Sequence, residues 1–475
     1  MTQKVLMPAR SIPGPAPVPI LGSKGNLINF MRDPIGYMLM LRREYGDVAA
    51  LVREVPRGMV FAFGPRYNQQ ILSEADTYLN AGITQPGPRE SANNRIGVGL
   101  LSMNGEAHKR VRRLVSMPFH YKTVPTYHEP VAELVKEMVD RWSDGQVIDI
   151  WKELTQLTKR ISIKMLLGLS DPTTALSVAD LMEEWFSVNI SFPARLMPVD
   201  LPGFPYQRML KLAERVEVRL LDLIKQKRES LSEKDHDVLS LLLRAGDDES
   251  EPFTDAELVG QVNFLFAASY ETTANSMSWI LFLLSQHPEI MASVHEHLQE
   301  VLGGRIPAYE DLEKLTVLER VMKEGLRLFA PPVYAYRVLS KDVELDQYEM
   351  PKGSTVAFSH YMTHLSPEIY DEPERFNPDR WLTVKPYNFE YLPFGAGAHA
   401  CLGGSLAYLI MKITFSTILS RYRLTVVPNS LIERKVLVTL QPRHGIPMRL
   451  TKQDGKFAQS KVPVTGNVHE MVNLG

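Results

Sequence analysis

The chain contains very little cysteine: among its 475 residues there is one, Cys401. A single thiol can neither close an intramolecular disulfide nor supply a structural zinc cage. This scarcity excludes a disulfide-stapled secreted protein, and we expect a reducing cytoplasm as its setting. The chain also lacks a charge excess, since 53 basic and 55 acidic side chains nearly cancel. That balance argues against a nucleic-acid coat or a polybasic membrane protein.

Long apolar runs are missing as well. A membrane-spanning helix needs about 20 mostly apolar residues, and the best stretch here, 279–284, is far shorter. The first residues hold no apolar run of the kind found in export signals, and Pro8 interrupts any early helix. The sequence therefore predicts a protein without a membrane anchor.

Helix and strand patterns are segregated along the chain, which predicts a mainly α (α+β) fold. Apolar residues at three- and four-residue spacing predict a helical core over about 105–330 and a last helix over 402–421. Charged stretches at 225–237 and 246–251 are predicted to be exposed connectors. We expect one domain over 1–475, whose remaining parts are β-rich portions at about 45–65, 333–360 and 423–450 and a tail over 451–475.

The clearest helix follows Thr254, and its pattern ends at Pro288. Thr254-Asp255-Ala256-Glu257 forms a capping box, and an acid in the first turn suits the helix dipole. Some 33 residues rising 1.5 Å each give a rod of roughly 50 Å. A helix of that length can cross a whole globular domain.

Cys401 lies in a glycine-rich loop just before the last predicted helix. A thiol must lose its proton to bind a metal, and the N–H groups of a helix N-terminus favour the charged form. The alternative is a small apolar cysteine in a turn. The residues around Cys401 argue against this alternative. Counted from Cys401, Phe at −7 and Gly at −4 and +2 would occur together by random placement with a chance of roughly one in seven thousand. The loop is Phe394-Gly395-Ala396-Gly397-Ala398-His399-Ala400-Cys401-Leu402-Gly403-Gly404.

This loop resembles the haem-binding loop of the cytochrome P450 family, in which a cysteine thiolate is the proximal iron ligand. The resemblance implies haem b as the cofactor and Cys401 as its axial ligand. Phe394 would shield the sulfur, and His399 would meet a haem propionate. The loop glycines would allow the backbone to pack closely on the cofactor: Gly395, Gly397 and Gly403.

Two further segments resemble parts of the same family. In the long helix, Thr272 would stabilise reduced oxygen, and Glu271 would help relay the protons that drive O–O cleavage. Ser269 stands where the family usually has glycine, and its hydroxyl could alter local water order. Glu324 and Arg327, one helical turn apart, would join Arg375 in a buried ionic triad that holds the cysteine loop. Taken alone, such residues would be a solvent-facing Glu and an ordinary surface salt bridge.

Basic residues complete the resemblance. His108, Arg112 and Arg337 match positions that bind haem propionates in the family. Lys109, Arg110 and Arg113 lie in the same predicted helix as His108 and Arg112. They would face either an acidic electron donor or simply the solvent.

The resemblance covers about 10–450 and implies a haem-thiolate monooxygenase. Such an enzyme inserts one atom of O₂ into a hydrophobic organic substrate by hydroxylation or epoxidation. One cysteine cannot ligate an iron–sulfur cluster, and the chain ends shortly after its last predicted strands. We therefore expect separate redox partners, a ferredoxin or flavodoxin with its reductase, drawing on NAD(P)H. We also expect a monomer that binds no nucleic acid.

Two alternatives stay open at this point. One is a peroxide-driven peroxygenase or an isomerase on the same fold, which the Glu271-Thr272 pair disfavours. The other is a non-catalytic haem-binding sensor. The sequence does not separate fatty acid, terpenoid, steroid and polyketide substrates. Mainly apolar residues are expected to line the pocket, among them Phe264, Ala268, Val333 and Tyr334.

Overall fold

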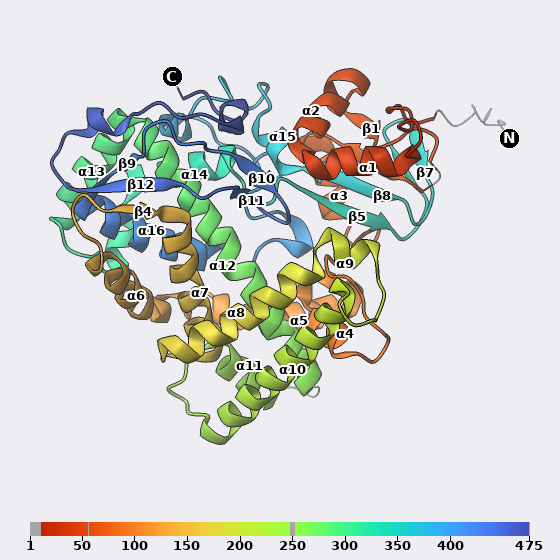
Figure 1. Ribbon diagram of the computed structural model, residues 1–475, viewed down its shortest axis with the longest axis horizontal. Coiled ribbons are helices and arrows are strands. Elements are labelled where there is room, and N and C mark those ends of the chain that lie inside the picture. The colour runs from red at the N-terminus through yellow and green to blue at the C-terminus, as the bar shows by residue number, and fades with distance from the viewer. Residues whose placement is uncertain (1–10, 56, 248–251, 475) are drawn as a thin grey trace.

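A computed structural model describes residues 11–55, 57–247 and 252–474 (Figure 1). The protein is mainly helical with small sheets, as the segregated patterns predict. In Figure 1 the largest sheet lies to one side with α1 (Gly22–Arg32) and α2 (Pro34–Tyr45), and most helices lie on the other side together with a smaller group of strands. Of the predicted charged connectors, 225–230 instead end helix α10, and 248–251 lie outside the described residues.

The largest sheet brings together segments that are far apart in the sequence. Its strands are ordered β1-β2-β8-β5-β3, and the β1–β2 hairpin lies in the first predicted β-rich portion. Strand β2 then pairs in parallel with β8, almost 300 residues later. The strands are β1 (Val48–Ala50), β2 (Met59–Ala62), β3 (Tyr78–Asn80), β5 (Tyr334–Leu339) and β8 (Thr355–Ser359), and β6 (Val343–Leu345) and β7 (Tyr348–Met350) form a separate hairpin.

The late strands form a second β-rich region. Strands β4 (Val147–Asp149), β12 (Pro447–Lys452) and β9 (Tyr422–Val426) make one sheet. Strands β10 (Arg434–Val436) and β11 (Leu440–Pro442) form a hairpin whose turn contains Leu437, Val438 and Thr439. The chain therefore reverses within the predicted β-rich portion 423–450, where the two residues after Val436 are exposed while Val436 and Leu440 are buried.

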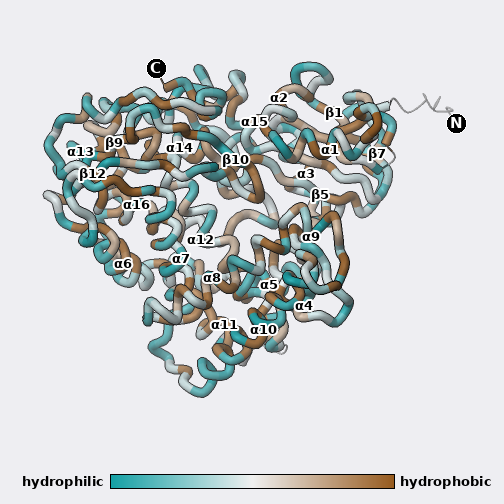
Figure 2. The backbone as a smooth tube through the Cα atoms, viewed as in Figure 1, coloured by the Kyte–Doolittle hydropathy of each residue, from teal (hydrophilic) through white to brown (hydrophobic). Residues whose placement is uncertain are grey.

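The remaining helices surround a long central one. Along the peripheral helices the hydropathy colouring of Figure 2 alternates, as expected for amphipathic helices. Besides α1, α2 and α12, the α-helices are α3 (Pro65–Ser73), α4 (Ala92–Gly97), α5 (Gly105–Ser116), α6 (His128–Asp140), α7 (Ile150–Leu167), α8 (Pro172–Asn189), α9 (Phe192–Leu196), α10 (Pro205–Ser230), α11 (Val238–Asp247), α13 (Pro288–Leu302), α14 (Thr316–Leu328), α15 (His360–His364) and α16 (Gly404–Arg421). Helix α16 is not peripheral, since it is buried throughout 409–419.

Helix α12 (Asp255–Gln286) is the predicted central rod. Both capping-box bonds are present: Glu257 N–H donates to Thr254 Oγ1, and Thr254 N–H donates to Glu257 Oε2. Its second half is buried throughout 273–286, whereas several residues of 264–272 are only partly buried. The functional motif of the helix therefore lies where the surrounding protein opens. Among the described helices, α12 included, none is long and apolar enough to cross a membrane.

The C-terminal segment differs from the free tail expected over 451–475. Val468 and Met471 are fully buried in the main hydrophobic core. Glu470 pairs with the buried Arg434 at 2.7 Å, and the Asn473 N–H donates to Glu374 O. Apolar residues in a polar stretch thus fasten the segment to the body of the protein.

Candidate active site

The cysteine loop is closed by its own backbone. Cys401 N–H donates to Phe394 O at 2.8 Å, and helix α16 begins three residues later. Gly395 and Gly397 have φ of +65° and +72°, which glycine adopts without strain. A Cβ on Gly397 would lie 2.0 Å from Leu72 O, so this glycine also permits a close backbone approach. The geometry presents Cys401 with an accessible side chain.

Opposing effects act on the Cys401 thiol. Desolvation by the surrounding protein raises its pKa. The N–H groups of Gly403 and Gly404 and the charge of Arg112 lower it by smaller amounts. The helix N-terminal donors predicted from the sequence are therefore present, but desolvation outweighs them. A bound metal cation would supply the missing stabilisation, because a coordinating thiol is deprotonated outright.

Two histidine rings contact each other at the loop, tilted by 40°, and one of them, His399, belongs to the loop itself. The ring centroids of His108 and His399 are 3.9 Å apart, and His399 Nδ1 lies 2.7 Å from Asn80 Nδ2. Burial and the nearby positive groups lower the pKa of His399 to about 3. Burial followed by the charge of Arg112 also lowers the pKa of His108. The buried His108 Nε2 has no hydrogen-bond partner among the described residues.

Two arginines lie with these histidines. Arg112 Nη2 donates to Ala400 O at 2.8 Å, next to Cys401. Arg337, on β5, is only 8% exposed, and burial lowers its pKa to about 10. Its Nη1 donates to the carbonyl of Tyr336. Within the described chain, neither guanidinium forms a salt bridge with a carboxylate.

The donor set fits the cofactor that the resemblance implies. Burying positive charge without a partner is costly, so a cluster of this kind suits anionic groups. Haem b carries two propionate carboxylates and an iron that accepts a thiolate. Cys401, His108, Arg112, Arg337 and His399 present both kinds of donor in one place.

The buried ion pair on α14 differs from its prediction in one member. Glu324 and Arg327 are fully buried and form two hydrogen bonds, of 2.9 and 3.0 Å. The third partner is Arg380, whose Nε lies 2.9 Å from Glu324 Oε1. The expected partner, Arg375, instead pairs with Glu372 in solvent and is 61% exposed.

The reason for this correction is visible in the sequence. Residues 373–376 and 378–381 are successive copies of a Pro-acid-Arg-aromatic pattern. The second copy lies in the helical turn Pro378–Leu382, which directs its arginine back to α14. Its aromatic residue, Trp381, adds a third donor, because Nε1 lies 3.0 Å from Glu324 Oε2. The first copy contributes only the Arg375 carbonyl, which accepts from Arg327 and Arg380.

His364 joins this ion pair to the cysteine loop, and sequence reasoning missed it. Arg327 Nη1 donates to His364 O, and His364 Nδ1 donates to Arg327 O. The other ring nitrogen, Nε2, accepts from the Leu392 N–H at 2.7 Å, two residues before Phe394. These contacts suit a neutral His364 ring. Burial also lowers the pKa of His364 well below its usual range. An isolated histidine carries no local signal of this role.

The residues of the α12 motif point in different directions. Thr272 Oγ1 donates back to Ala268 O at 2.8 Å. Glu271 Oε1 accepts from Thr439 Oγ1 at 2.7 Å, and no hydrogen bond joins Glu271 to Thr272, both of which are described. Burial raises the pKa of Glu271. Ser269 Oγ lies 2.8 Å from Ser162 Oγ on α7, which engages its hydroxyl with that helix.

The predicted pocket residues separate into two groups. Ala268 is exposed although it lies in the interior of a helix, and Phe264 and Tyr334 are partly buried. Burial raises the pKa of Tyr334 to about 12. Val333 is 1% exposed and belongs to the main hydrophobic core, so its side chain does not face an accessible surface.

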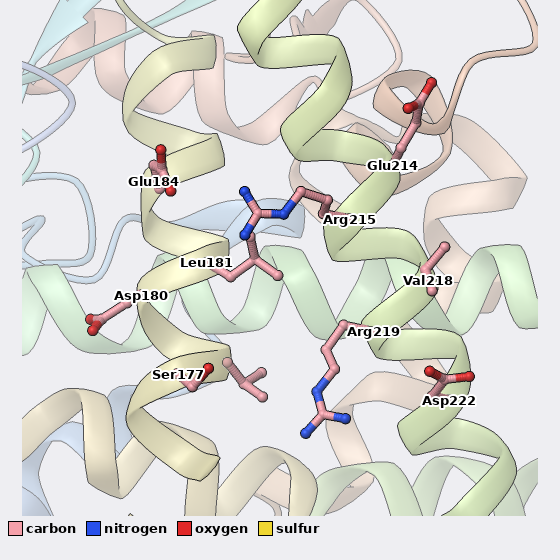
Figure 3. A pocket seen from close by; sticks show the side chains of 10 residues that line it. Ser177, Asp180, Leu181, Glu184, Glu214, Arg215, Val218, Arg219 and Asp222 are labelled. Atoms are coloured by element: carbon pink, nitrogen blue, oxygen red, sulfur yellow. The ribbon is translucent and has the colours of Figure 1, made fainter. Parts of the chain in front are cut away.

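A separate cavity of ≈ 670 Å³ opens between α8 and α10 (Figure 3). Its lining includes Asp180, Glu184, Arg215 and Arg219, with apolar Leu181 and Val218 between them. None of its lining residues belongs to the cysteine loop or to α12. Its mixed charges set it apart from the apolar candidates on α12.

Comparisons with known proteins agree with this geometry. The sequence model of the Cytochrome P450 family matches residues 12–446. The chain is 31% identical to a pentalenene oxygenase of Streptomyces avermitilis, covering 92% of this chain and 96% of that protein. It is also 31% identical to a cyclooctat-9-en-7-ol 5-monooxygenase of Streptomyces melanosporofaciens, covering 88% and 90%. A retinoic-acid-bound cyanobacterial CYP120A1 superposes with a TM-score of 0.80 at 23% identity, covering 94% of this chain and all of that one.

Proposed function

This chain belongs to the cytochrome P450 family, as a haem b monooxygenase, and on that premise we propose that Cys401 is the axial ligand of the haem iron. Haem b, when bound, supplies oxygen activation and the transfer of one oxygen atom. The observation that carries this assignment is an accessible cysteine beside buried basic side chains that no carboxylate of the described chain neutralises. Phe394, Gly395 and Gly403 would shape the loop around the sulfur.

The basic cluster would hold the propionates. Arg112 and Arg337 supply charged N–H donors, and a neutral His399 and His108 each supply one N–H. Bound carboxylates would offset the desolvation that lowers the pKa of Arg337 to about 10. The ion pair Glu324–Arg327, completed by Arg380, would have a structural role in supporting the loop through His364.

Glu271 would relay protons near the substrate, and Thr272 would offer its hydroxyl there. The burial that raises the pKa of Glu271 increases its protonated fraction near neutral pH, which suits a proton donor. Thr272 would offer its hydroxyl after releasing the bond to Ala268 O. Both side chains lie where α12 is only partly buried, beside the exposed Ala268.

The substrate is proposed to be a cyclic, hydrocarbon-rich terpenoid. Two relatives are named for pentalenene and cyclooctat-9-en-7-ol, which are compounds of this kind. Phe264, Ala268 and Tyr334 offer a mainly apolar lining with one phenol. A spectral titration with cyclic terpenes, fatty acids and steroids tests this. Water displacement from the iron by fatty acids alone would overturn the substrate proposal.

Electrons are proposed to come from a separate ferredoxin or flavodoxin with its reductase, using NAD(P)H. On the α5 face, Lys109 pairs with Glu106 and Arg110 with Glu257, so part of the basic charge is already neutralised. The test of function measures NAD(P)H consumption and oxygenated product with surrogate partners. Substrate-dependent consumption with an oxygenated product supports the proposal. Turnover with peroxide alone would point to a peroxygenase instead.

A further inference from the structure

A chain of side-chain hydrogen bonds ends at the carboxyl group of Glu271. Trp151 Nε1, on α7, donates to Asn275 Oδ1 at 2.7 Å. Asn275 Nδ2 donates to Thr439 Oγ1 at 3.0 Å, and Thr439 Oγ1 donates to Glu271 Oε1 at 2.7 Å. Asn275 is 0% and Thr439 4% exposed. This series of hydrogen bonds thus links α7, α12 and the turn of the β10–β11 hairpin.

The chemistry of these groups fixes the direction of the first two bonds, and of the third when Glu271 is ionised. An indole N–H can only donate, so Trp151 must face the amide oxygen of Asn275. The amide NH₂ then faces Thr439, whose oxygen accepts and whose own proton is left for Glu271. Hydrogen bonds in such a buried series polarise one another. Oε1 of Glu271 is committed to this bond, which makes Oε2 the oxygen that can take up and release a proton.

We propose that Thr439 is a positioning residue for Glu271. The Thr439 hydroxyl orients the Glu271 carboxyl group for proton delivery toward Thr272. The inference rests on the relay role proposed above for Glu271. Thr439 acts through that carboxyl group and is not itself assigned a contact with substrate or cofactor. Because Leu437 and Val438 in the same turn are exposed apolar residues, the hairpin joins the acid to a surface that can meet a hydrophobic molecule.

The hairpin does not depend on the Thr439 hydroxyl for its own structure. Leu437 N–H donates to the Thr439 carbonyl, and Leu440 N–H donates to Pro331 O. Trp279 Nε1 donates to Leu440 O at 3.2 Å. Since none of these bonds uses the Thr439 hydroxyl, removing the hydroxyl alone should leave the turn in place. A variant at Thr439 can therefore separate a positioning role from a structural one.

Other charged groups near Glu271 lie on the α8 side. Glu183 raises the pKa of Glu271 through its negative charge, but its carboxylate is bound by Lys159 Nζ at 2.5 Å and by the Tyr270 hydroxyl at 3.2 Å. Asp180 also pairs with Lys159. The Thr439 bond acts against burial by stabilising the carboxylate. Removing that bond should move the pKa of Glu271 upward.

The test compares three haem-loaded variants with the wild type: T439V, which lacks the hydroxyl, T439S, which keeps it, and E271Q. Infrared difference spectra across pH record the carboxylic acid C=O band that E271Q removes. Assays with surrogate redox partners record product formed per NAD(P)H consumed. For T439V we expect a higher titration midpoint, a C=O band at higher wavenumber, and a ratio lowered about threefold to tenfold. T439S should restore all three.

Three results would overturn the inference in distinguishable ways. If E271Q lowers the product ratio while T439V matches the wild type in both titration and ratio, Thr439 does not position the acid. If E271Q leaves the ratio unchanged, the relay role of Glu271 itself fails, and the inference fails with it. A T439S variant that behaves like T439V would also overturn it, because a variant that keeps the hydroxyl would then share the defect.

Discussion

Arg380 Nε lies 2.9 Å from Glu324 Oε1 inside the protein, where both side chains are almost completely buried. Glu324 therefore balances two buried arginines, Arg327 and Arg380, and also accepts from the Trp381 indole. His364 connects this cluster to Leu392, two residues before the cysteine loop. The support of the active-site loop thus begins on α14, far from Cys401 in the sequence.

Removing Arg380 should destabilise the protein, whereas removing Arg375 should not. Arg380→Leu leaves the Glu324 carboxylate short of a buried partner, a loss worth about 3–5 kcal/mol. Arg375→Leu removes an exposed pair with Glu372, worth at most about 1 kcal/mol. Chemical denaturation and haem content measure both. An equal loss of stability in the two variants would show that Arg375, too, belongs to the buried ionic cluster.

Adding a methyl group at Gly397 should disrupt the cysteine loop. In Gly397→Ala the new Cβ would meet Leu72 O at 2.0 Å, in a backbone with φ of +72°. Gly455→Ala is the matched control, because its φ is +70° and nothing lies within 4 Å of a Cβ there. We expect about 1 kcal/mol for the control, from backbone strain alone, and several kcal/mol with loss of haem for Gly397→Ala. Haem retention that is equal in both would contradict the close approach.

His360 should make the stability of the protein depend on pH below neutrality. Burial lowers its pKa to about 3, whereas the unfolded chain binds that proton near 6.5. Between these values the unfolded state holds more protons, so stability is complete above pH 6.5 and falls as the pH drops toward 3, by up to about 1.4 kcal/mol per pH unit. His360→Gln should flatten this slope in denaturation series, and the exposed His236→Gln should not. A slope unchanged by His360→Gln would show that this histidine is protonated in the fold.

Ser269 should have little influence on oxygen chemistry. Its hydroxyl is engaged with Ser162 on α7 and with Phe266 O. Ser269→Gly should therefore leave the ratio of product to NAD(P)H within about twofold, while lowering stability by about 1 kcal/mol through glycine in a helix. Product yield and thermal unfolding check the two parts. A large change in the ratio of product to NAD(P)H would show that the Ser269 hydroxyl does influence the oxygen chemistry.

Local signals allowed the sequence to predict much of the fold. The capping box at Thr254 and the stop at Pro288 gave the bounds of α12, and the same proline begins α13. These features depend only on residues a few positions apart. The turn of the β10–β11 hairpin carries no such signal, because its exposed apolar pair, Leu437 and Val438, resembles the middle of a strand.

The missed members of the site share a different property. Arg380, His364 and Thr439 act on groups tens to hundreds of residues away, and no short motif singles out any of them. Two copies of one pattern offered Arg375 and Arg380 equally, and only the reversal of the chain near Pro378 decides between them. Such choices depend on tertiary contacts that spacing does not encode.

The identity of the iron ligand is the claim on which the rest depends, and the absorption spectrum of the reduced protein with carbon monoxide tests it directly. With Cys401 as thiolate ligand, the Soret band should lie far to the red, as is characteristic of thiolate ligation. Cys401→His should keep bound haem but lose that shifted band. A Cys401→His protein that retained the shifted band would contradict the account.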